Sequence, residues 1–274
     1  MLVYPRRRQR QMCIKDSPTV APVKNAIQVK QSTTSLLKLE GSQAEQGCHW
    51  PKIQSIFDQY WLQQPELNEA FNIDSVLLQQ LDANEKDLER QGHYMSAMLK
   101  YAGEWYWGLD RLGHLEERLN MLGINRDKER INIVFNKTYA DFCHSPAELV
   151  SHSDKTLVVF FSIRSPYSHL GLLQAIKLAE HYKIALEIKP ILPMVMRGLS
   201  VPATKKMYIF HDTKREAKKL GIEYGFVADP LGQGVENCYC LFSYAQSLGC
   251  ELQFMLNYSQ AVNAQGIRTE TYLG

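Results

Sequence analysis

The residues of this sequence that are best placed to do chemistry are Ser165-Pro166-Tyr167-Ser168. Serine is favoured at the N-cap of a helix, and proline suits the first helical position because its missing N–H costs nothing there. The pattern therefore predicts a helix that begins at Ser165. The unpaired N–H groups and the positive dipole end of such a helix favour an anion beside the Ser165 hydroxyl, and a thiolate is one such anion. A serine that merely caps a helix fits the same pattern.

The flanking segments predict the elements that hold this turn. Leu157–Phe161 is a short apolar run rich in β-branched and aromatic residues, which is typical of a strand covered on both faces. Residues 185–192, ALEIKPIL, predict a second strand parallel to the first, so that the two strands and the helix between them form a βαβ unit. The apolar residues of that helix recur at spacings of three, at Leu170, Leu173, Ile176, Ala179 and Tyr182.

The stretch FSIRSPYSHL resembles the opening strand and active-site turn of the DsbA-like branch of the thioredoxin superfamily. This branch includes 2-hydroxychromene-2-carboxylate isomerases and kappa-class glutathione transferases. The segment after Val201 is similar to their helical insertion, with Pro202-Ala203, an Asp-x-x-Arg helix and a late Ala-x-x-Ala-x-Gly-Ile. The resemblance covers about residues 155–274 and implies an α/β, thioredoxin-like fold with a helical insertion.

The resemblance also implies a cofactor and a set of site residues. In that family the serine before the proline replaces the first redox cysteine and hydrogen-bonds the glutathione sulfur, which assigns the catalytic position to Ser165. Glutathione is then the expected cofactor, with Ser165, Pro166, Tyr167, Lys205 and Lys206 as its binding residues. The two lysines either meet carboxylates of glutathione or of an aromatic acid, or belong to a solvated helix face. His169 is either an acid–base group or a packing residue, and Asp212 with Arg215 is expected to form a surface pair.

A second piece of the same family is present upstream. Residues 92–122 predict a strand, a tight turn, an aromatic strand and a helix, and Trp107, Gly108, Asp110, Arg111 and Leu112 resemble a Trp-Gly-x-Asp-Arg-Leu segment that follows the last strand in that family. The longer pattern resembles members with two tandem thioredoxin-like domains. Trp105, Tyr106 and Trp107 are expected to pack at a domain junction, since basic residues are not interleaved as in a base-stacking platform.

These resemblances predict the following division of the chain. It comprises a weakly ordered tail (1–45), the C-terminal part of a first DsbA-like domain (46–123), a linker (124–155) and a second such domain lacking its C-terminal hairpin (156–274). Two outcomes are open. Either the sequence is a fragment of a longer protein, or the hairpin at 93–107 pairs with the strand at 157–163 and completes one sheet, as in a circular permutant.

The cysteines argue against disulfide exchange and against a metal site. A dithiol oxidoreductase needs an attacking and a resolving thiol, yet both matching positions, Ser165 and Ser168, are serines. The six cysteines are scattered, as expected for reduced thiols in a cytoplasmic protein. Cys238 and Cys240 are predicted to point to different sides of one helix. The pairs Cys48-His49 and Cys143-His144 match no standard metal-ligand spacing, so no metal is expected.

The composition of the chain gives no support for a nucleic-acid or membrane partner. The chain has 274 residues with 31 basic and 29 acidic side chains, and this balance gives no electrostatic case for nucleic acid. No apolar run approaches the ~20 residues needed to span a bilayer. The leading hypothesis is a glutathione-dependent isomerase or transferase acting on a small molecule, such as an unsaturated aromatic acid. The alternatives are a catalytically silent thioredoxin-like binding or scaffold module, or a protein that shares only the fold of disulfide oxidoreductases. The oligomeric state is left open.

Overall fold

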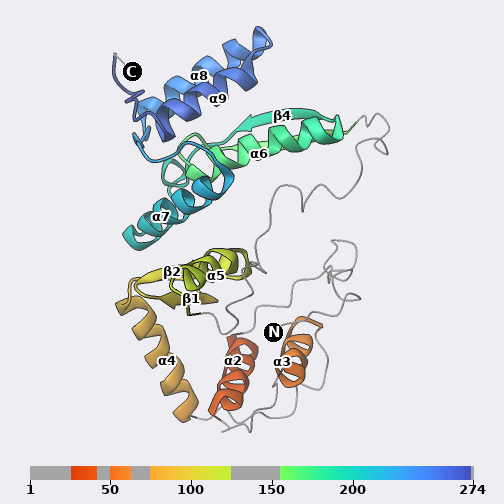
Figure 1. Ribbon diagram of the computed structural model, residues 1–274, viewed down its shortest axis with the longest axis vertical. Coiled ribbons are helices and arrows are strands. Elements are labelled where there is room, and N and C mark those ends of the chain that lie inside the picture. Colours follow the sequence, from red (N-terminus) through yellow and green to blue (C-terminus); the bar gives the residue numbers. More distant parts are fainter. Residues whose placement is uncertain (1–25, 42–49, 63–74, 125–154, 273–274) are drawn as a thin grey trace. The chain divides into compact units, whose positions relative to one another are not determined.

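The computed structural model describes residues 26–41, 50–62, 75–124 and 155–272 (Figure 1). The chain divides into two compact units, Met1–Gly92 and His93–Gly274. Each unit is described by itself below. Residues 156–272 of the second unit contain the turn that the sequence singles out.

Three helices make up the described part of the first unit: α2 (Ala26–Gly41), α3 (Trp50–Leu62) and α4 (Ser75–Arg90). Helix α2 differs from the weak order expected for residues 1–45. It packs against α3 and α4, and Thr34 in its middle is buried. Packing of this kind stabilises helices that have little intrinsic preference for the helical state.

The second unit begins with a hairpin and a helix, in the predicted order. Strand β1 (Met98–Tyr101) pairs antiparallel with β2 (Glu104–Trp107). The connecting Ala102 and Gly103 both have positive φ, the conformation of a tight two-residue hairpin turn. The short 3₁₀ helix η3 (Leu109–Arg111) follows and leads into α5 (Leu112–Met121).

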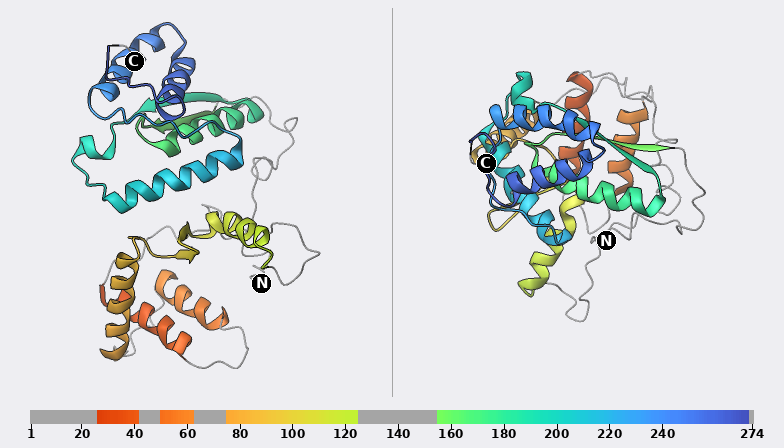
Figure 2. Two further views of the ribbon diagram at one scale, coloured as in Figure 1. Left: turned by 60° about the vertical axis from the view of Figure 1, so that its left-hand side comes forward. Right: turned by 90° about the horizontal axis from the view of Figure 1, so that it is seen from above.

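The βαβ unit expected around Ser165 is present. Strand β3 (Thr156–Phe161) pairs parallel with β4 (Ala185–Pro190), and α6 (Pro166–Tyr182) lies between them in sequence. Figure 2 shows α6 running along this sheet. Strand β4 ends two residues before the predicted Leu192, and the short helix η6 (Met194–Arg197) follows.

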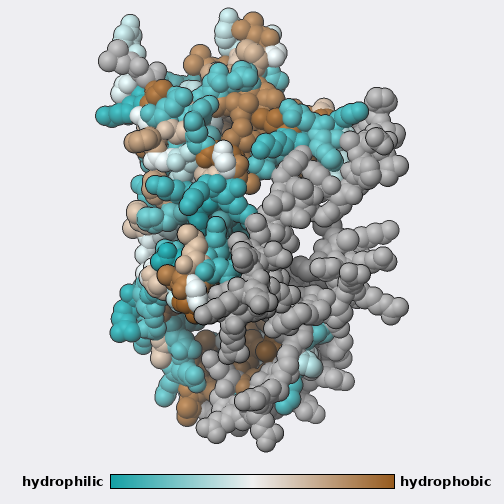
Figure 3. Space-filling model, viewed as in Figure 1, coloured by the Kyte–Doolittle hydropathy of each residue, from teal (hydrophilic) through white to brown (hydrophobic). Residues whose placement is uncertain are grey.

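The prediction that the first strand is covered on both faces is wrong for the described residues. Burial alternates along β3, with Val159 and Phe161 facing the core while Val158 and Phe160 are 36% and 65% exposed. The pleat of the strand explains the alternation, because successive side chains point to opposite faces of the sheet and only one face is covered. In Figure 3, apolar surface gathers near β4, α8 and α9.

The hairpin does not complete this sheet. Strands β1 and β2 pair with each other, and β3 and β4 form a separate two-stranded sheet. Of the two outcomes left open by the sequence, the pairing of residues 93–107 with residues 157–163 is therefore wrong. The hairpin and η3 instead contact α7 (Ala203–Leu220) through side chains, as described below.

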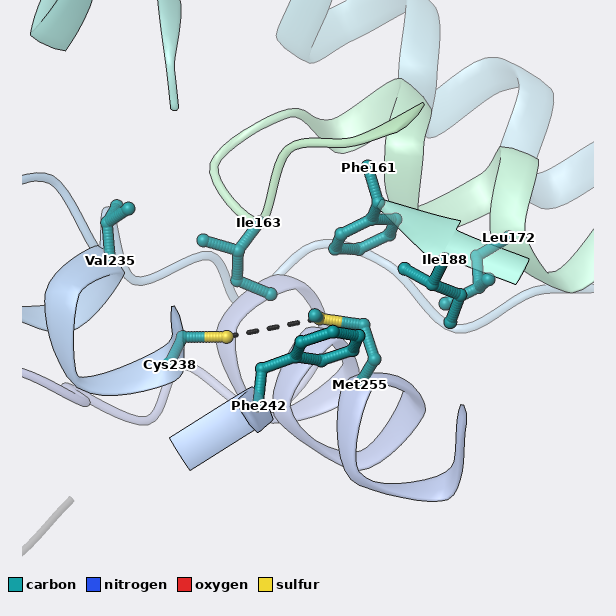
Figure 4. Close-up of a cluster of buried hydrophobic side chains, with 8 residues drawn as sticks. All are labelled: Phe161, Ile163, Leu172, Ile188, Val235, Cys238, Phe242 and Met255. Atoms are coloured by element: carbon teal, nitrogen blue, oxygen red, sulfur yellow. Dashed lines mark hydrogen bonds between the residues drawn. The ribbon is translucent and has the colours of Figure 1, made fainter. Parts of the chain in front are cut away.

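The core of the second unit lies between the sheet and two helices, α8 (Gln233–Ser247) and α9 (Glu251–Asn263), which pack side by side (Figure 2). Figure 4 shows the fully enclosed cluster, in which the Cys238 thiol lies 3.9 Å from the Met255 sulfur. Its members are Phe161, Ile163, Leu172, Ile188, Val235, Cys238, Phe242 and Met255. Cys238 is buried and Cys240 is exposed, which confirms that the two thiols point to different sides of α8.

The segment Gly232-Gln233-Gly234 forms the start of α8, with Gly232 as its N-cap. Gly232 has a φ of 82°, and Gly234 approaches the Thr269 hydroxyl and Pro230 closely. Small residues are needed here because the chain after α9 crosses the first turn of α8. Within the described ranges, no helix is both long and apolar enough to cross a membrane.

Candidate active site

Ser165 occupies the position predicted from the sequence. It is the N-cap of α6, and Pro166 is the first helical residue. The Ser165 Oγ accepts a hydrogen bond from the backbone N–H of Ser168 at 3.3 Å, and the Ser165 carbonyl accepts one from the N–H of His169 at 3.2 Å. The hydroxyl proton of Ser165 has no acceptor among the described residues. It is therefore available to a ligand at the positive end of the helix dipole.

Ser165 lines a cavity of about 480 Å³. This volume lies in the range that small-molecule sites occupy. Apolar side chains from several elements form much of its wall, among them Ile191, Met194, Ile209, Phe210 and Val262. The cavity thus presents a hydroxyl at one place on a largely apolar surface, an arrangement that orients a ligand with both apolar and polar parts.

The charged residues of the cavity are mostly positive. Arg164, Arg197, Lys205 and Lys206 line it, together with the single carboxylate of Asp229. Arg164 and Asp229 form a bidentate ion pair, and the Lys206 Nζ lies 3.9 Å from Asp229 Oδ2. Arg197 has no ion-pair partner within the described ranges. An excess of positive charge beside an apolar wall favours an anionic ligand.

Tyr167 lines the cavity, but its hydroxyl is already engaged. It donates a hydrogen bond to Asp212 Oδ2 at 2.6 Å. Burial, together with this hydrogen bond and the charge of Asp212, raises the pKa of Tyr167 well above its usual range. The phenol therefore stays protonated, and its contribution to the cavity is a fixed ring rather than a free proton donor.

The expected surface pair between Asp212 and Arg215 is wrong. Asp212 is fully buried, and its carboxylate binds the Arg111 guanidinium at 2.8 Å through Nε and at 2.8 Å through Nη2. Arg215 instead donates to the carbonyl of Trp105 and stacks over the ring of Tyr106. Residues three apart on a helix face the same way, but packing of another segment on α7 took Asp212 out of solvent.

His169 packs rather than faces the cavity. It is buried, and its ring nitrogens contact the Ser259 hydroxyl at 2.8 Å and the carbonyl of Glu223 at 3.1 Å. Burial lowers the pKa of His169 despite the opposing contact with Glu223. Of its two predicted roles, the geometry supports packing.

The structure brings together all five predicted binding residues, because Ser165, Pro166, Tyr167, Lys205 and Lys206 all line the cavity. The sequence analysis missed Arg164, Arg197 and Asp229. Arg164 carried a usable signal, since a basic residue directly before an N-cap must lie near the helix N-terminus. Arg197 and Asp229 come from segments whose approach to Ser165 depends on the folding of the chain.

No cluster of three or more possible metal ligands occurs among the residues that the structure describes. Cys48, His49, Cys143 and His144 lie outside the described residues. At the helix start, Ser168 occupies the place of a second thiol, and its Oγ lies 3.4 Å from the backbone nitrogen of Ser162. Neither position of the turn carries sulfur, so the protein itself offers no thiol there for disulfide exchange.

Comparison with known proteins agrees with the geometry. The family model described as DSBA-like thioredoxin domain matches residues 156–269. This span begins at β3 and ends just after α9, so it includes the βαβ unit, the Ser165 turn and the helices that cover it. No curated protein and no solved structure gives a significant match to the chain. Residues 156–269 are thus similar to a DsbA-like thioredoxin domain, and the fold of this part of the chain is α/β and thioredoxin-like.

Proposed function

We propose that this domain binds glutathione and uses its sulfur as the nucleophile of an isomerase- or transferase-type reaction. The observation that carries the proposal is the position of the Ser165 hydroxyl. It lies at the N-terminus of α6 and in the wall of a cavity with four basic side chains and one carboxylate. A thiolate placed there gains a hydrogen bond from Ser165 and the favourable helix dipole. These two interactions lower the thiol pKa and raise the thiolate fraction.

The rest of the cavity suits the remaining groups of such a ligand. Lys205 and Arg197 are available to the carboxylates of glutathione or of an acidic substrate. The apolar wall suits an aromatic ring. A substrate with both features is an unsaturated aromatic acid, the class that the sequence resemblance implies.

The reaction has two steps. The thiolate sulfur forms a bond to the β-carbon of the conjugated double bond, and the π electron pair moves onto the conjugated carbonyl oxygen. The former double bond is then a single bond, so its substituents rotate. Return of the electron pair expels the thiolate and restores the double bond in the other geometry. No oxidant is consumed. With an alkylating electrophile, the sulfur displaces the leaving group instead.

Isothermal titration calorimetry with glutathione tests the proposal. The intact chain is expected to bind glutathione, and the Ser165→Ala variant to bind it about five- to tenfold more weakly, because one hydrogen bond is lost. S-methylglutathione, which cannot form a thiolate, is the matched ligand and is expected to bind both proteins equally. Ser247→Ala, at the far end of α8, is the matched variant. Absence of glutathione binding by the intact chain would overturn the proposal.

A second candidate function is a binding module without catalysis. The observation that favours it is serine at both thiol positions of the turn, Ser165 and Ser168. The two functions differ in one measurement. A catalytic domain depletes or isomerises a conjugated aromatic acid when glutathione is present, and a binding module leaves its absorbance spectrum unchanged.

A further inference from the structure

We propose that Arg111 is a positioning residue for the Ser165–Tyr167 turn and acts through the buried carboxylate of Asp212. Arg111 does not line the cavity and lies 101 positions before Asp212 in the sequence. This role rests on the proposed function of the Ser165 site. Hydrogen–deuterium exchange tests it without any ligand, and glutathione affinity tests it together with that function.

The buried carboxylate of Asp212 needs a counter-charge. Its side chain is fully buried, and an isolated carboxylate in that setting is strongly unfavourable. Arg111 provides the charge through three close contacts, Nε to Oδ1 at 2.8 Å, Nε to Oδ2 at 3.0 Å and Nη2 to Oδ2 at 2.8 Å. Burial would raise the pKa of Asp212, but the hydrogen bonds from Arg111 and Tyr167 outweigh it and hold the pKa below its usual range. Arg111 therefore keeps this carboxylate ionised.

The ionised carboxylate is linked to the cavity. Asp212 Oδ2 accepts the Tyr167 hydroxyl at 2.6 Å, and Oδ1 accepts the Tyr208 hydroxyl at 3.3 Å. Hydrogen bonds to a charged acceptor are stronger than neutral ones. Tyr167 is the second residue of α6 and lines the cavity two positions after Ser165. Holding its hydroxyl therefore holds the first turn of the helix.

Neighbouring contacts with α7 hold Arg111 itself in place. The segment around it contacts α7 at two further residues, both on the C-terminal side of Asp212. Arg215 donates to the carbonyl of Trp105 at 3.1 Å and lies 4.5 Å above the Tyr106 ring. The next residue of α7, Glu216, contacts the His114 ring, and its Oε1 lies 3.6 Å from Arg111 Nη1. Arg111 is thus fixed in place, and its charge reaches Asp212 in a defined geometry.

Hydrogen–deuterium exchange provides a test without any ligand. The amides of Ser168 and His169 are bonded to Ser165, so their exchange rates report the first turn of α6. We expect Arg111→Met to raise these rates about tenfold, with much smaller changes in α8 and α9. Arg118→Met is the matched control on α5, because Arg118 is half exposed and lies 3.7 Å from the exposed Glu104. It is expected to leave the rates at Ser168 and His169 unchanged.

A double-mutant cycle separates positioning from general destabilisation. Tyr167→Phe removes only the hydroxyl that Asp212 holds. If Arg111 acts through that hydroxyl, Arg111→Met adds little further exchange at Ser168 and His169 in the Tyr167→Phe background. Fully additive effects, or a rise spread evenly over α6, α8 and α9, would overturn the proposal. Should Arg111→Met fail to fold, Arg111→Lys keeps the charge without the planar fork and is expected to give a smaller rise at the same two amides.

The affinity for glutathione is a second measurement, and it depends on the proposed function. Arg111→Met is expected to weaken glutathione binding several-fold, and not to weaken it further when Tyr167→Phe is present. If the intact chain binds no glutathione while exchange follows the expected pattern, the proposed function fails and the positioning role stands. If binding is observed but Arg111→Met leaves both exchange and affinity unchanged, the positioning role fails.

Discussion

Arg164 and Asp229, 65 residues apart in sequence, form a bidentate ion pair on the wall of the cavity, with Nε–Oδ1 and Nη2–Oδ2 distances both of 2.7 Å. Arg164 directly precedes the N-cap Ser165, and Asp229 lies in the segment before α8. The pair therefore connects the helix start to the opposite part of the domain. It also neutralises one of the basic side chains beside Ser165, which leaves Arg197 and Lys205 as the cations most available to a ligand.

Arg164→Met is expected to lower the free energy of unfolding by about 1 kcal/mol. The Arg164 side chain is 18% exposed and Asp229 is 42% exposed, so solvent screens the pair only in part. Urea denaturation measures the change. Arg268→Met removes a pair of equal length, 2.7 Å to Glu270, in which the arginine is 73% exposed. We expect this control to change stability by less than about 0.5 kcal/mol. Equal losses in the two variants would contradict the structural role of Arg164.

Ser165→Cys is expected to place a thiol with a depressed pKa at the start of α6. The helix dipole and the nearby basic residues stabilise the thiolate, so its pKa should fall below the roughly 8.5 of a free cysteine by about one unit or more. The rate of alkylation by iodoacetamide, followed by mass spectrometry of the peptide that contains position 165, gives this value. Ser247→Cys, in the last turn of α8, is the matched control, where the dipole has the opposite sign. A higher pKa at position 165 than at position 247 would refute the electrostatics described for the site.

Gly234→Ala is expected to destabilise the domain by about 1–3 kcal/mol. A Cβ at this position would lie 2.8 Å from the Thr269 hydroxyl oxygen and 3.1 Å from the Pro230 Cβ, so the surrounding chain must shift. Gly171→Ala, in α6, is the opposite case, since nothing lies within 4 Å of its added Cβ. Alanine favours the helical state there, and we expect Gly171→Ala to raise the free energy of unfolding by about 0.5–1 kcal/mol. Thermal unfolding of the two variants side by side shows whether the signs differ.

The pH dependence of stability is expected to follow Asp212. Its pKa is lower in the folded protein than in the unfolded chain, so the folded state binds fewer protons and gains stability above roughly pH 4. This gain is lost as the pH falls through the folded-state pKa. Asp212→Asn cannot titrate at this position. We expect the free energy of unfolding of wild type to exceed that of Asp212→Asn by about 3 kcal/mol at pH 7.

Urea denaturation at pH 7 and at pH 3 measures this dependence. The difference in unfolding free energy between wild type and Asp212→Asn should narrow at pH 3, because the unfolded chain then takes up a proton at Asp212 that the folded protein binds less readily. Glu216 and Asp229 also have lowered pKa values and contribute acid sensitivity to both proteins, so the comparison isolates Asp212. A difference that is constant with pH would show that Asp212 is not ionised in the folded protein.

The local part of the site could be predicted from the sequence because it depends on neighbouring residues. An apolar strand, a serine N-cap and a proline at the first helical position specify one turn through contacts over a few residues. The same holds for the hairpin at Ala102-Gly103, for the division of Cys238 and Cys240 between two sides of α8, and for the parallel return of β4. Each of these rests on a periodicity or a turn preference that the sequence displays directly.

Only the tertiary structure decided which distant side chains meet. The sequence placed Asp212 three residues before Arg215 and so predicted a surface pair, but α7 is covered at that point and Asp212 pairs with Arg111 instead. Likewise, extension of the sheet by the hairpin was one of two outcomes that the sequence left open, yet the hairpin packs against a helix through Arg215 and Trp105. Spacing along a chain determines which residues share a face of an element. Which face is then buried, and against what, depends on the packing of the whole domain.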